Sequence, residues 1–308
     1  QEWTTAGLSM EVSVNISPHH LHSSTFVESL GKMLKKYPAV RPGNLQLEIL
    51  ESSAFGDLQK VNHILQVCRE KLGVQIALDD FGTGYSSLTH LRNLTSQTIK
   101  IDQSFVRDIL DDANDFSIVD GIIGLTKSFS LDVIAEGVET TEHGLMLLSM
   151  GCTLAQGYHI ARPMPATQFA QWLEHYSPVE AWTHFASVKL SAKNSLLLQA
   201  HLVMGHWYSQ FERAMASPES APSIAKNAQK QQAVFMAKAL KEKLFERSEF
   251  ELLESAHNNL HQKTDIALAT YHEHSKEESA QALKEAKESY RQFLDLLKEL
   301  GLSFQPLP

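Results

Sequence analysis

The pattern of hydrophobic and polar residues changes near residue 176. Before that point, short β-rich runs alternate with amphipathic stretches, of which residues 58–71 and 114–129 have helical periodicity. The β-like runs are EVSVNIS, NLQLEILES, VQIALDDFG, SQTIKIDQSF, LDVIAEGVE and LAQGYHIARP. Strand–helix alternation at this spacing predicts βαβ units and a parallel sheet. The regularity of these runs favours a parallel α/β barrel, with a doubly wound sheet as the alternative.

After residue 176 the β signal ends and the periodicity becomes helical. The expected helices are residues 186–208, 224–245, 250–271 and 277–300, with a loop at residues 216–223. Ser275 and Glu278 form a capping-box pattern before the last helix, and Gly301 follows it as a stop signal. We therefore expect an α/β domain over residues 1–174 and an α-helical bundle over residues 175–308.

Composition and charge narrow the classes of function. The 308 residues are 43% hydrophobic and 20% charged, as in soluble globular proteins, and the formal net charge is −9. That charge argues against a broad face for a nucleic-acid polymer, although a small anion could bind through metal ions. Cys68 and Cys152 form no CxxC pair, which favours a reducing compartment. With no membrane-length apolar run and no visible signal peptide, we expect a cytoplasmic location.

Polar residues gather where the predicted strands end. In chain order, these ends carry Asn15, Glu48 with Glu51, Asp79 with Asp80, Lys100 with Asp102, Glu136 with Glu139, and Gln156. In a parallel barrel the carboxyl ends of the strands form the active-site face. Because side chains alternate along a strand, Lys100 and Asp102 should lie on one face. The set is therefore a candidate active site.

Taken one at a time, these residues have ordinary structural interpretations. An Asp-Asp pair before glycine is usually a turn, a strand-end Asn or Glu is usually a helix cap, and a lone strand Lys usually faces solvent. Together, apart from the lysine, they form an oxygen-rich set without cysteine or histidine, which suits Mg²⁺ or Mn²⁺ rather than structural zinc. Two divalent ions ~4 Å apart would offset the repulsion among the carboxylates and activate water for attack on a phosphodiester.

Six short motifs follow one another along residues 1–174. They are VNIS at 14–17, LEILES at 47–52, DDFGTGYSS at 79–87, KID at 100–102, AEGVE at 135–139 and QGYHIARPMP at 156–165. Their order and spacing resemble those of the EAL domain, a bacterial cyclic-di-GMP phosphodiesterase family. The resemblance implies a modified TIM barrel with one antiparallel strand. It also implies cleavage of one phosphodiester of cyclic di-GMP to give linear pGpG, with Mg²⁺ or Mn²⁺.

The resemblance further implies a role for each strand-end residue. Those similar to metal ligands are Asn15, Glu48, Asp79, Asp80 and Glu136, with Asp80 serving the second metal and Glu136 also holding water. Lys100 is similar to the lysine that positions or helps to deprotonate the attacking water, with Asp102 and Gln156 as supporting residues.

Glu51 is similar to a glutamate that binds no metal. In the family, that residue steadies the glycine-containing loop after Asp80, and the loop shapes the second metal site and the dimer contact. The resemblance therefore implies a catalytic support role for Glu51 and favours a homodimer.

One motif of the family has no counterpart here. The Glu-Ala-Leu motif that names the family carries a further metal-binding glutamate and should lie well upstream of Asn15, where this chain has only 14 residues. Neither ESL at Glu28 nor EIL at Glu48 can replace it. The other catalytic positions keep the expected residue types, so we expect a fragment lacking the first strands rather than a degenerate domain. A sensor or GGDEF-like module could precede it.

The helical half carries a second, weaker pattern. His257 and His261 form an HxxxH pair on one helix face, a geometry suited to zinc. Upstream, AHLVMGHWY resembles a segment of CZB, a bacterial zinc-binding sensory domain, although Leu202 stands where that domain has cysteine. His201 could substitute for the cysteine, and the fourth ligand would be His175 or His184. The alternative is that these histidines are packed or surface residues of a bundle.

Three functions from different classes stay open on the sequence. The chain could be a cyclic-di-GMP phosphodiesterase regulated by its helical bundle, or a receptor that holds the dinucleotide without cutting it. It could also be an interaction protein with an inert barrel, whose bundle recruits partners or senses zinc or oxidants. The upstream glutamate separates the first two. Changes at His257 and His261 that alter signalling, but not nucleotide binding, would identify the third.

Overall fold

The computed structural model describes residues 2–51, 58–84, 95–216, 234–240, 242–273 and 276–302. The chain divides into two compact units. The first unit comprises residues 1–106, 118–139 and 152–177, and the second comprises residues 107–117, 140–151 and 178–308. The domain boundary expected at residue 174 stays a prediction.

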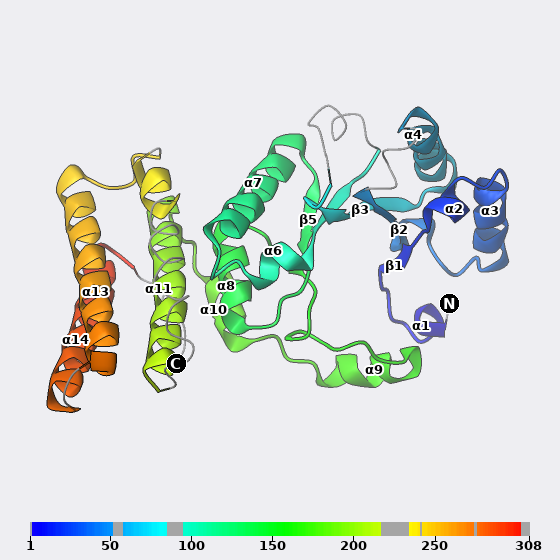
Figure 1. Cartoon of the computed structure of the whole chain (residues 1–308). Coiled ribbons are helices and arrows are strands. Elements are labelled where there is room, and N and C mark those ends of the chain that lie inside the picture. The colour runs from blue at the N-terminus through cyan, green and yellow to red at the C-terminus, as the bar shows by residue number, and fades with distance from the viewer. Residues whose placement is uncertain are drawn as a thin grey trace. The chain divides into compact units, whose positions relative to one another are not determined.

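The first unit is built on a six-stranded sheet in which every neighbouring pair is parallel. The strands are β1 (Val12–Asn15), β2 (Leu45–Leu50), β3 (Gln75–Phe81), β4 (Thr98–Ile101), β5 (Asp132–Ala135) and β6 (Leu154–Ala155), shown in Figure 1. Their spatial order is their sequence order. That order is typical of a (β/α) barrel wall, because a doubly wound sheet reverses direction at its switch point. The predicted barrel-type fold is confirmed, and no antiparallel pair occurs among the described residues.

Helices flank and connect the strands of this unit. They are α1 (Glu2–Thr5), α2 (Pro18–Leu21), α3 (Phe26–Lys36), α4 (Leu58–Val67), α6 (Gln103–Arg107), α7 (Ala113–Phe129) and α9 (Ala166–His175). A 3₁₀ turn, Pro42–Asn44, precedes β2, and a π-helical turn, Cys68–Leu72, follows α4. The first residues of α7 belong to the second unit.

Side chains on the central strands of the sheet are buried, whereas those on its two edge strands are exposed. Ile76, Ile99 and Ile101 on the central strands are buried, because side chains cover the sheet there. At one edge, Val12 and Val14 of β1 are 40% and 42% exposed, and at the other Leu154 of β6 is 49% exposed. Within the described residues each of these edge strands has one strand neighbour, so the sheet does not close into a barrel.

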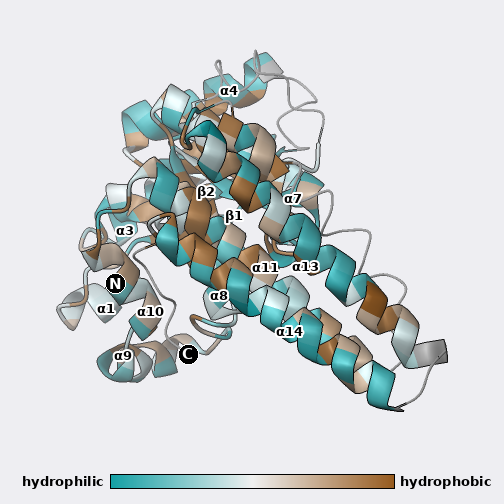
Figure 2. Ribbon diagram, turned by 90° about the vertical axis from the view of Figure 1, so that its left-hand side faces the viewer, coloured by the Kyte–Doolittle hydropathy of each residue, from teal (hydrophilic) through white to brown (hydrophobic). Residues whose placement is uncertain are grey.

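The second unit is helical. Its elements are α8 (Thr141–Met150), α10 (Glu180–Ser187), α11 (Ala192–Ala216), a helical segment at residues 234–240, α13 (Arg247–Glu273) and α14 (Lys276–Glu299). Hydrophobic and hydrophilic residues alternate along α13 and α14 in Figure 2, as expected for helices with one buried face. Phe211, Leu260 and Phe293 are among its buried side chains. The helical character predicted for the second half is confirmed.

The structure corrects two predicted helices, and the one expected over residues 224–245 is no longer helical at residues 242–245. Residues 186–208 were expected to form one helix, but α10 ends at Ser187 and α11 begins at Ala192. The Ser191 hydroxyl accepts a hydrogen bond of 3.1 Å from the Asn194 amide, which caps the new start. Gly301 has φ +111° after α14, as its stop role requires. Ser275, the loop after Ala216 and residues 224–233 lie outside the described residues.

Among the described residues, no helix is both long and apolar enough to cross a bilayer.

Candidate active site

The candidate site lies at the carboxyl ends of adjacent strands. Glu48 lies on β2, Asp79 and Asp80 on β3, and Lys100 on β4, while Glu136 follows β5 directly. Asn15 ends β1 in register with Glu48. Gln156 follows β6, and its carbonyl accepts a 3.0 Å hydrogen bond from the Val138 amide. Parallel pairing therefore brings residues from distant parts of the chain to one edge of the sheet.

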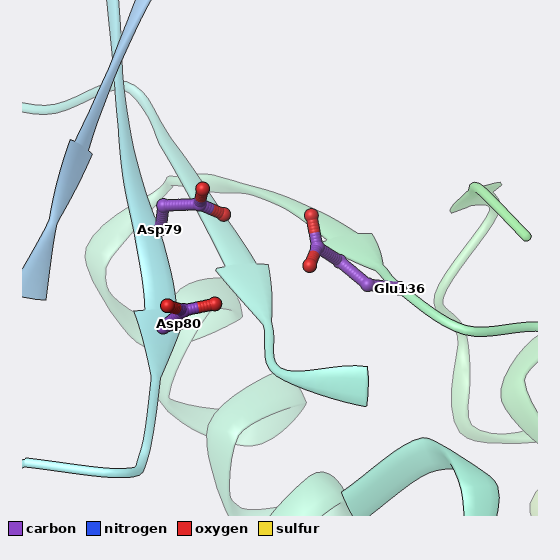
Figure 3. A group of neighbouring side chains, drawn as sticks. All are labelled: Asp79, Asp80 and Glu136. Carbon is purple, nitrogen blue, oxygen red and sulfur yellow. The ribbon is translucent and has the colours of Figure 1, made fainter. Parts of the chain in front are cut away.

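Two adjacent aspartates can share this site because β3 is irregular there. Neighbouring side chains of a regular strand point to opposite faces. Here the β3–β4 register shifts between Leu78 and Phe81, and Asp80 has φ +55°. A bulge of this kind re-aims a side chain. Figure 3 shows the result, in which the carboxylates of Asp79, Asp80 and Glu136 point into one space.

Lys100 is the central cation of the site. It is 3% exposed, and its Nζ lies 3.0 Å from Glu48 Oε1 and 3.0 Å from Asp79 Oδ1. It also forms an ion pair with Glu136. Glu48 and Asp79 are themselves 6% and 7% exposed, so these charges are held away from bulk water. Buried charges persist in a fold only when opposite charges and hydrogen bonds compensate them.

Burial and the neighbouring charges together shift the pKa values of Lys100 and Glu136. Burial alone would lower the pKa of Lys100, but its bond to Glu136 and the other carboxylates raise that pKa above its ordinary value. Burial raises the pKa of Glu136, and the charges of Asp79 and Glu48 add to the rise, whereas Lys100 opposes it. Gln156 Nε2 donates a 2.6 Å hydrogen bond to Glu136 Oε1, which fixes the direction of that carboxylate.

Asp80 lies beside a second acid, Asp102. Burial raises the pKa of Asp80, and the charges of Asp79 and Asp102 and a hydrogen bond with Asp102 raise it further. Asp102 is oriented by Ser104, whose amide donates to its Oδ1 at 2.9 Å and whose hydroxyl donates to the same atom. Asp102 therefore contacts the cluster through Asp80.

Glu51 holds the glycine-containing turn after β3. Its Oε2 accepts hydrogen bonds from the Gly82 amide at 2.9 Å and the Gly84 amide at 3.4 Å. A side chain at Gly84 would meet Glu51 Oε1 at 2.7 Å, and Gly82 has φ +104°. Gly82 is therefore favoured by its backbone conformation, and Gly84 by the closeness of the Glu51 carboxylate. Glu51 therefore contacts the turn after Asp80, and the catalytic support role expected for it stays a prediction.

The carboxylates fit a divalent cation. One oxygen from each of Asp79, Asp80 and Glu136 lies within 4.8 Å of the others. Asp79 Oδ1 is buried and accepts no hydrogen bond of normal geometry among the described residues, although Lys100 is near. Clustered carboxylate oxygens that repel one another are the hard donors that Mg²⁺ and Mn²⁺ prefer. Glu48 and Asn15, at the ends of neighbouring strands, are further oxygen donors.

A cleft of about 630 Å³ opens beside Glu136 and Gln156. Tyr158, Arg162, Phe169 and Trp172 also line it. Tyr158 is 58% exposed, with the Arg162 guanidinium 4.9 Å from its ring centre. Sequence reasoning selected only Gln156 from the QGYHIARP run. The sequence signal that could have indicated the cleft is the aromatic Tyr158 and the basic Arg162, which follow β6 closely.

The structure brings together two of the three candidate zinc ligands. His257 Nε2 and His261 Nε2 on α13 lie 2.9 Å apart, and both side chains are buried. Among the described residues, the strand-end trio is the only group of three or more His, Cys, Asp or Glu ligand atoms this close, so His201 does not complete a site with the pair. Zinc binding here stays a prediction.

The fold and site define a barrel-type α/β domain with an acidic candidate cation site at its strand ends. The chain belongs to the EAL domain family, whose description matches residues 1–163. It is 38% identical over 172 residues to the cyclic di-GMP phosphodiesterase PA2567 of Pseudomonas aeruginosa, covering 56% of this chain and 29% of that protein. It is 36% identical over 170 residues to the probable cyclic di-GMP phosphodiesterase PdeN of Escherichia coli, covering 55% and 32%.

Solved structures of other proteins are also similar to this chain in sequence and fold. The PaMucR phosphodiesterase in complex with c-di-GMP is 36% identical, with a TM-score of 0.53 over 55% of this chain and 68% of that chain. The EAL domain of Mycobacterium smegmatis DcpA is also 36% identical, with a TM-score of 0.54 over 57% and 80%. The chain thus spans about a third of the length of the two curated relatives named above.

Proposed function

We propose that this chain carries a cyclic-di-GMP phosphodiesterase centre, which cleaves one phosphodiester bond to give linear pGpG. The observation that carries the proposal is the position of Lys100, within 3.0 Å of Glu48 and Asp79 and paired with Glu136. A buried cation therefore lies beside the group formed by Asp79, Asp80 and Glu136. The family membership and the named relatives supply the substrate class.

The residues of the chain have distinct tasks in this proposal. Asp79, Asp80 and Glu136 would hold two divalent ions together with Glu48 and Asn15. When bound, Mg²⁺ or Mn²⁺ would supply positive charge to the phosphate and lower the pKa of water. Lys100, kept charged by its neighbours, would stabilise negative charge that develops on the phosphate oxygens. Gln156 would hold Glu136 in position, and Glu51 would hold the turn after Asp80.

The neighbouring cleft is suited to a purine base. The exposed ring of Tyr158 offers a stacking surface, and Arg162 adds a charge and planar donors. Stacking on an aromatic side chain is worth about 1–3 kcal/mol per base. Tyr158→Ala should therefore weaken cyclic-di-GMP binding by about tenfold or more, and should change the turnover number less.

Product formation tests the proposal directly. The purified chain is incubated with cyclic di-GMP and Mn²⁺, and pGpG is measured by chromatography. We expect product from the wild type and at least about a hundredfold less from Asp79→Asn. Asp132→Asn is the matched control, because Asp132 begins β5 at the opposite end of the sheet. Equal product from all three proteins would contradict the assignment of the site.

A receptor that binds without cleavage is the second candidate. Lys100 already pairs with three carboxylates, so part of their charge is compensated without any metal. Calorimetry separates the two proposals. Tight binding of cyclic di-GMP without pGpG, in protein supplied with Mn²⁺, would favour the receptor and count against the enzyme.

We further propose that the helical unit is regulatory, with the buried pair of His257 and His261 as a candidate zinc site. Titration with Co²⁺, whose absorption reports histidine coordination, tests the site. Saturable binding in the wild type that is lost in His257→Ala would support it. Unchanged binding in that variant would exclude the pair. The homodimer and an upstream GGDEF-like module stay predictions.

A further inference from the structure

The chain passes from the candidate active site into the helical unit over a short distance. Strand β4 carries Lys100, Asp102 follows it, and α6 then leads to residues 107–117. Those residues belong to the second compact unit. Strand β5, which precedes Glu136, is likewise followed by α8 of the second unit. The helical unit therefore includes the continuations of two catalytic strands.

Helix α11 contacts residues 107–117, the continuation of β4, at Asp111. His206 Nε2 lies 3.1 Å from Asp111 Oδ1 and 3.2 Å from Oδ2, and Gln210 Nε2 donates to Oδ1. His206 and Gln210 are one turn apart, so they share one face of α11. We call Asp111, His206 and Gln210 the Asp111 clamp.

The clamp holds a charge that is partly removed from solvent. Burial alone would raise the pKa of Asp111, but bonds from His206 and Gln210 and the charges of His206 and His143 lower it below its ordinary value. His143 lies on α8, the continuation that follows Glu136 and Glu139. The carboxylate therefore stays ionised, and breaking the clamp would leave it without its partners at a real cost in free energy.

Trp207, the residue after His206, is buried in the helical unit. The Trp207 ring lies 4.2 Å from the His261 ring, centre to centre, and His261 contacts His257. Phe116 packs on Phe235 at 5.1 Å, which gives residues 107–117 a second attachment within the same unit. Helix α11 therefore contacts α13 through Trp207 and the continuation of β4 through the clamp.

We propose that the Asp111 clamp is the contact through which the helical unit regulates the catalytic strand β4. A displacement of α11 must either break the clamp or carry Asp111 with it, and Asp111 is joined to β4 through α6. The displacement is then passed along the backbone to Asp102 and Lys100, whose position sets the charge of the site. This inference rests on the proposed function, since it concerns the regulation of the same centre.

Hydrogen exchange and turnover together test the clamp. His206→Ala, Asp111→Asn and the double variant are compared with the wild type and with Ser209→Ala. Ser209 is exposed on the same helix and its hydroxyl donates to the Gly205 carbonyl, so its variant is the matched control. We expect amide exchange in Thr98–Ile101 to become about two- to thirtyfold faster in each clamp variant, with a similar fall in pGpG formation. The double variant should match the stronger single one.

Each outcome decides the proposal. Unchanged exchange in β4 of folded clamp variants, or effects of the two substitutions that multiply, would overturn it, because residues of one clamp act together. Faster exchange with undiminished turnover would also overturn it. If the wild type forms no pGpG, the proposed function fails, and exchange in β4 still shows whether the clamp holds that strand.

Discussion

The strand-end cluster of the first unit and the histidine pair of the second both bury ionisable side chains. Lys100 is 3% exposed and His257 is 4% exposed. Around Lys100, three carboxylates compensate the cation, and both signs of charge persist. Around His257 burial acts almost alone, lowering its pKa to about 3 and that of His261 to about 4.

The difference shows two ways in which a fold can tolerate buried titratable groups. A group with close partners of opposite charge keeps its charge, whereas a group among apolar side chains becomes neutral. The charged cluster can act on an anionic phosphate, because its field is already in place. The neutral pair offers ring nitrogens to a soft or borderline metal. Substitutions that remove compensation should therefore harm the first region more than the second.

The largest effect should follow loss of the central cation. Lys100→Met leaves Glu48, Asp79 and Glu136 buried without it, so we expect unfolding free energy, measured with urea, to fall by about 3–5 kcal/mol. Lys32→Met is the control, because the Lys32–Glu28 pair is well exposed and should contribute no more than about 1 kcal/mol. Similar small losses in both variants would show that the buried cluster is not charge-compensated as described.

Divalent ions should stabilise the charged cluster specifically. At Mn²⁺ concentrations about a hundredfold above the dissociation constant, the unfolding free energy should rise by about 3 kcal/mol. Thermal melts with and without Mn²⁺ measure the increase. Asp80→Asn should lose most of it, while Asp132→Asn, at the other end of β5, should retain it. Stabilisation that is identical in both variants would place the ion elsewhere.

The histidine pair should make metal-free protein sensitive to mild acid. The folded pKa values of about 3 and about 4 lie below the ordinary 6.5, so the fold favours the neutral rings. Their stabilisation is complete above pH 6.5, falls by up to about 1.4 kcal/mol per pH unit per histidine as the pH drops below 6.5, and is gone once the pH has fallen through the folded values.

Urea unfolding at pH 7, 6 and 5, after chelation, measures this loss. The double variant His257→Gln with His261→Gln should have a flatter pH dependence than the wild type. His63→Gln, which changes an exposed histidine on α4, should leave the wild-type slope intact. A wild-type slope in the double variant would mean that other groups cause the acid sensitivity.

The smallest effect concerns the backbone beside the charged cluster. Gly84→Ala would press a methyl group against the Glu51 carboxylate and should cost about 1 kcal/mol. Gly121→Ala is a matched control within α7, because nothing lies within 4 Å of the added atom. The control should be neutral or stabilising by up to about 1 kcal/mol, since alanine favours helix. Equal effects in urea unfolding would argue against the tight Glu51 contact.

The sequence predicted the strand ends well because period-two patterning and parallel topology are local rules. Each β-like run contains its observed strand, and the strand order follows from βαβ alternation. Adjacent aspartates were recognised as a pair, but local rules place them on opposite faces. Only the bulge at Asp80 brings both carboxylates to one side, and that bulge depends on pairing with β4.

Contacts between distant segments could not be predicted from the sequence. The pairing of Asp111 with His206 joins residues far apart in the chain and has no motif. The break between α10 and α11 was missed because the apolar periodicity runs on through residues 188–191, while Ser191 supplies a cap. Neither the cleft residue Tyr158 nor its neighbour Arg162 stood out, since cleft lining depends on how the segment after β6 turns.

The open edge at β1 has a practical consequence for every measurement on this chain. Val12 and Val14 are exposed on a strand with one paired neighbour among the described residues, so unpaired backbone donors and acceptors face outward. Such an edge can recruit any extended segment, including the same strand of another molecule. Protein concentration therefore becomes an experimental variable, and turnover, exchange and unfolding data are best collected as dilution series.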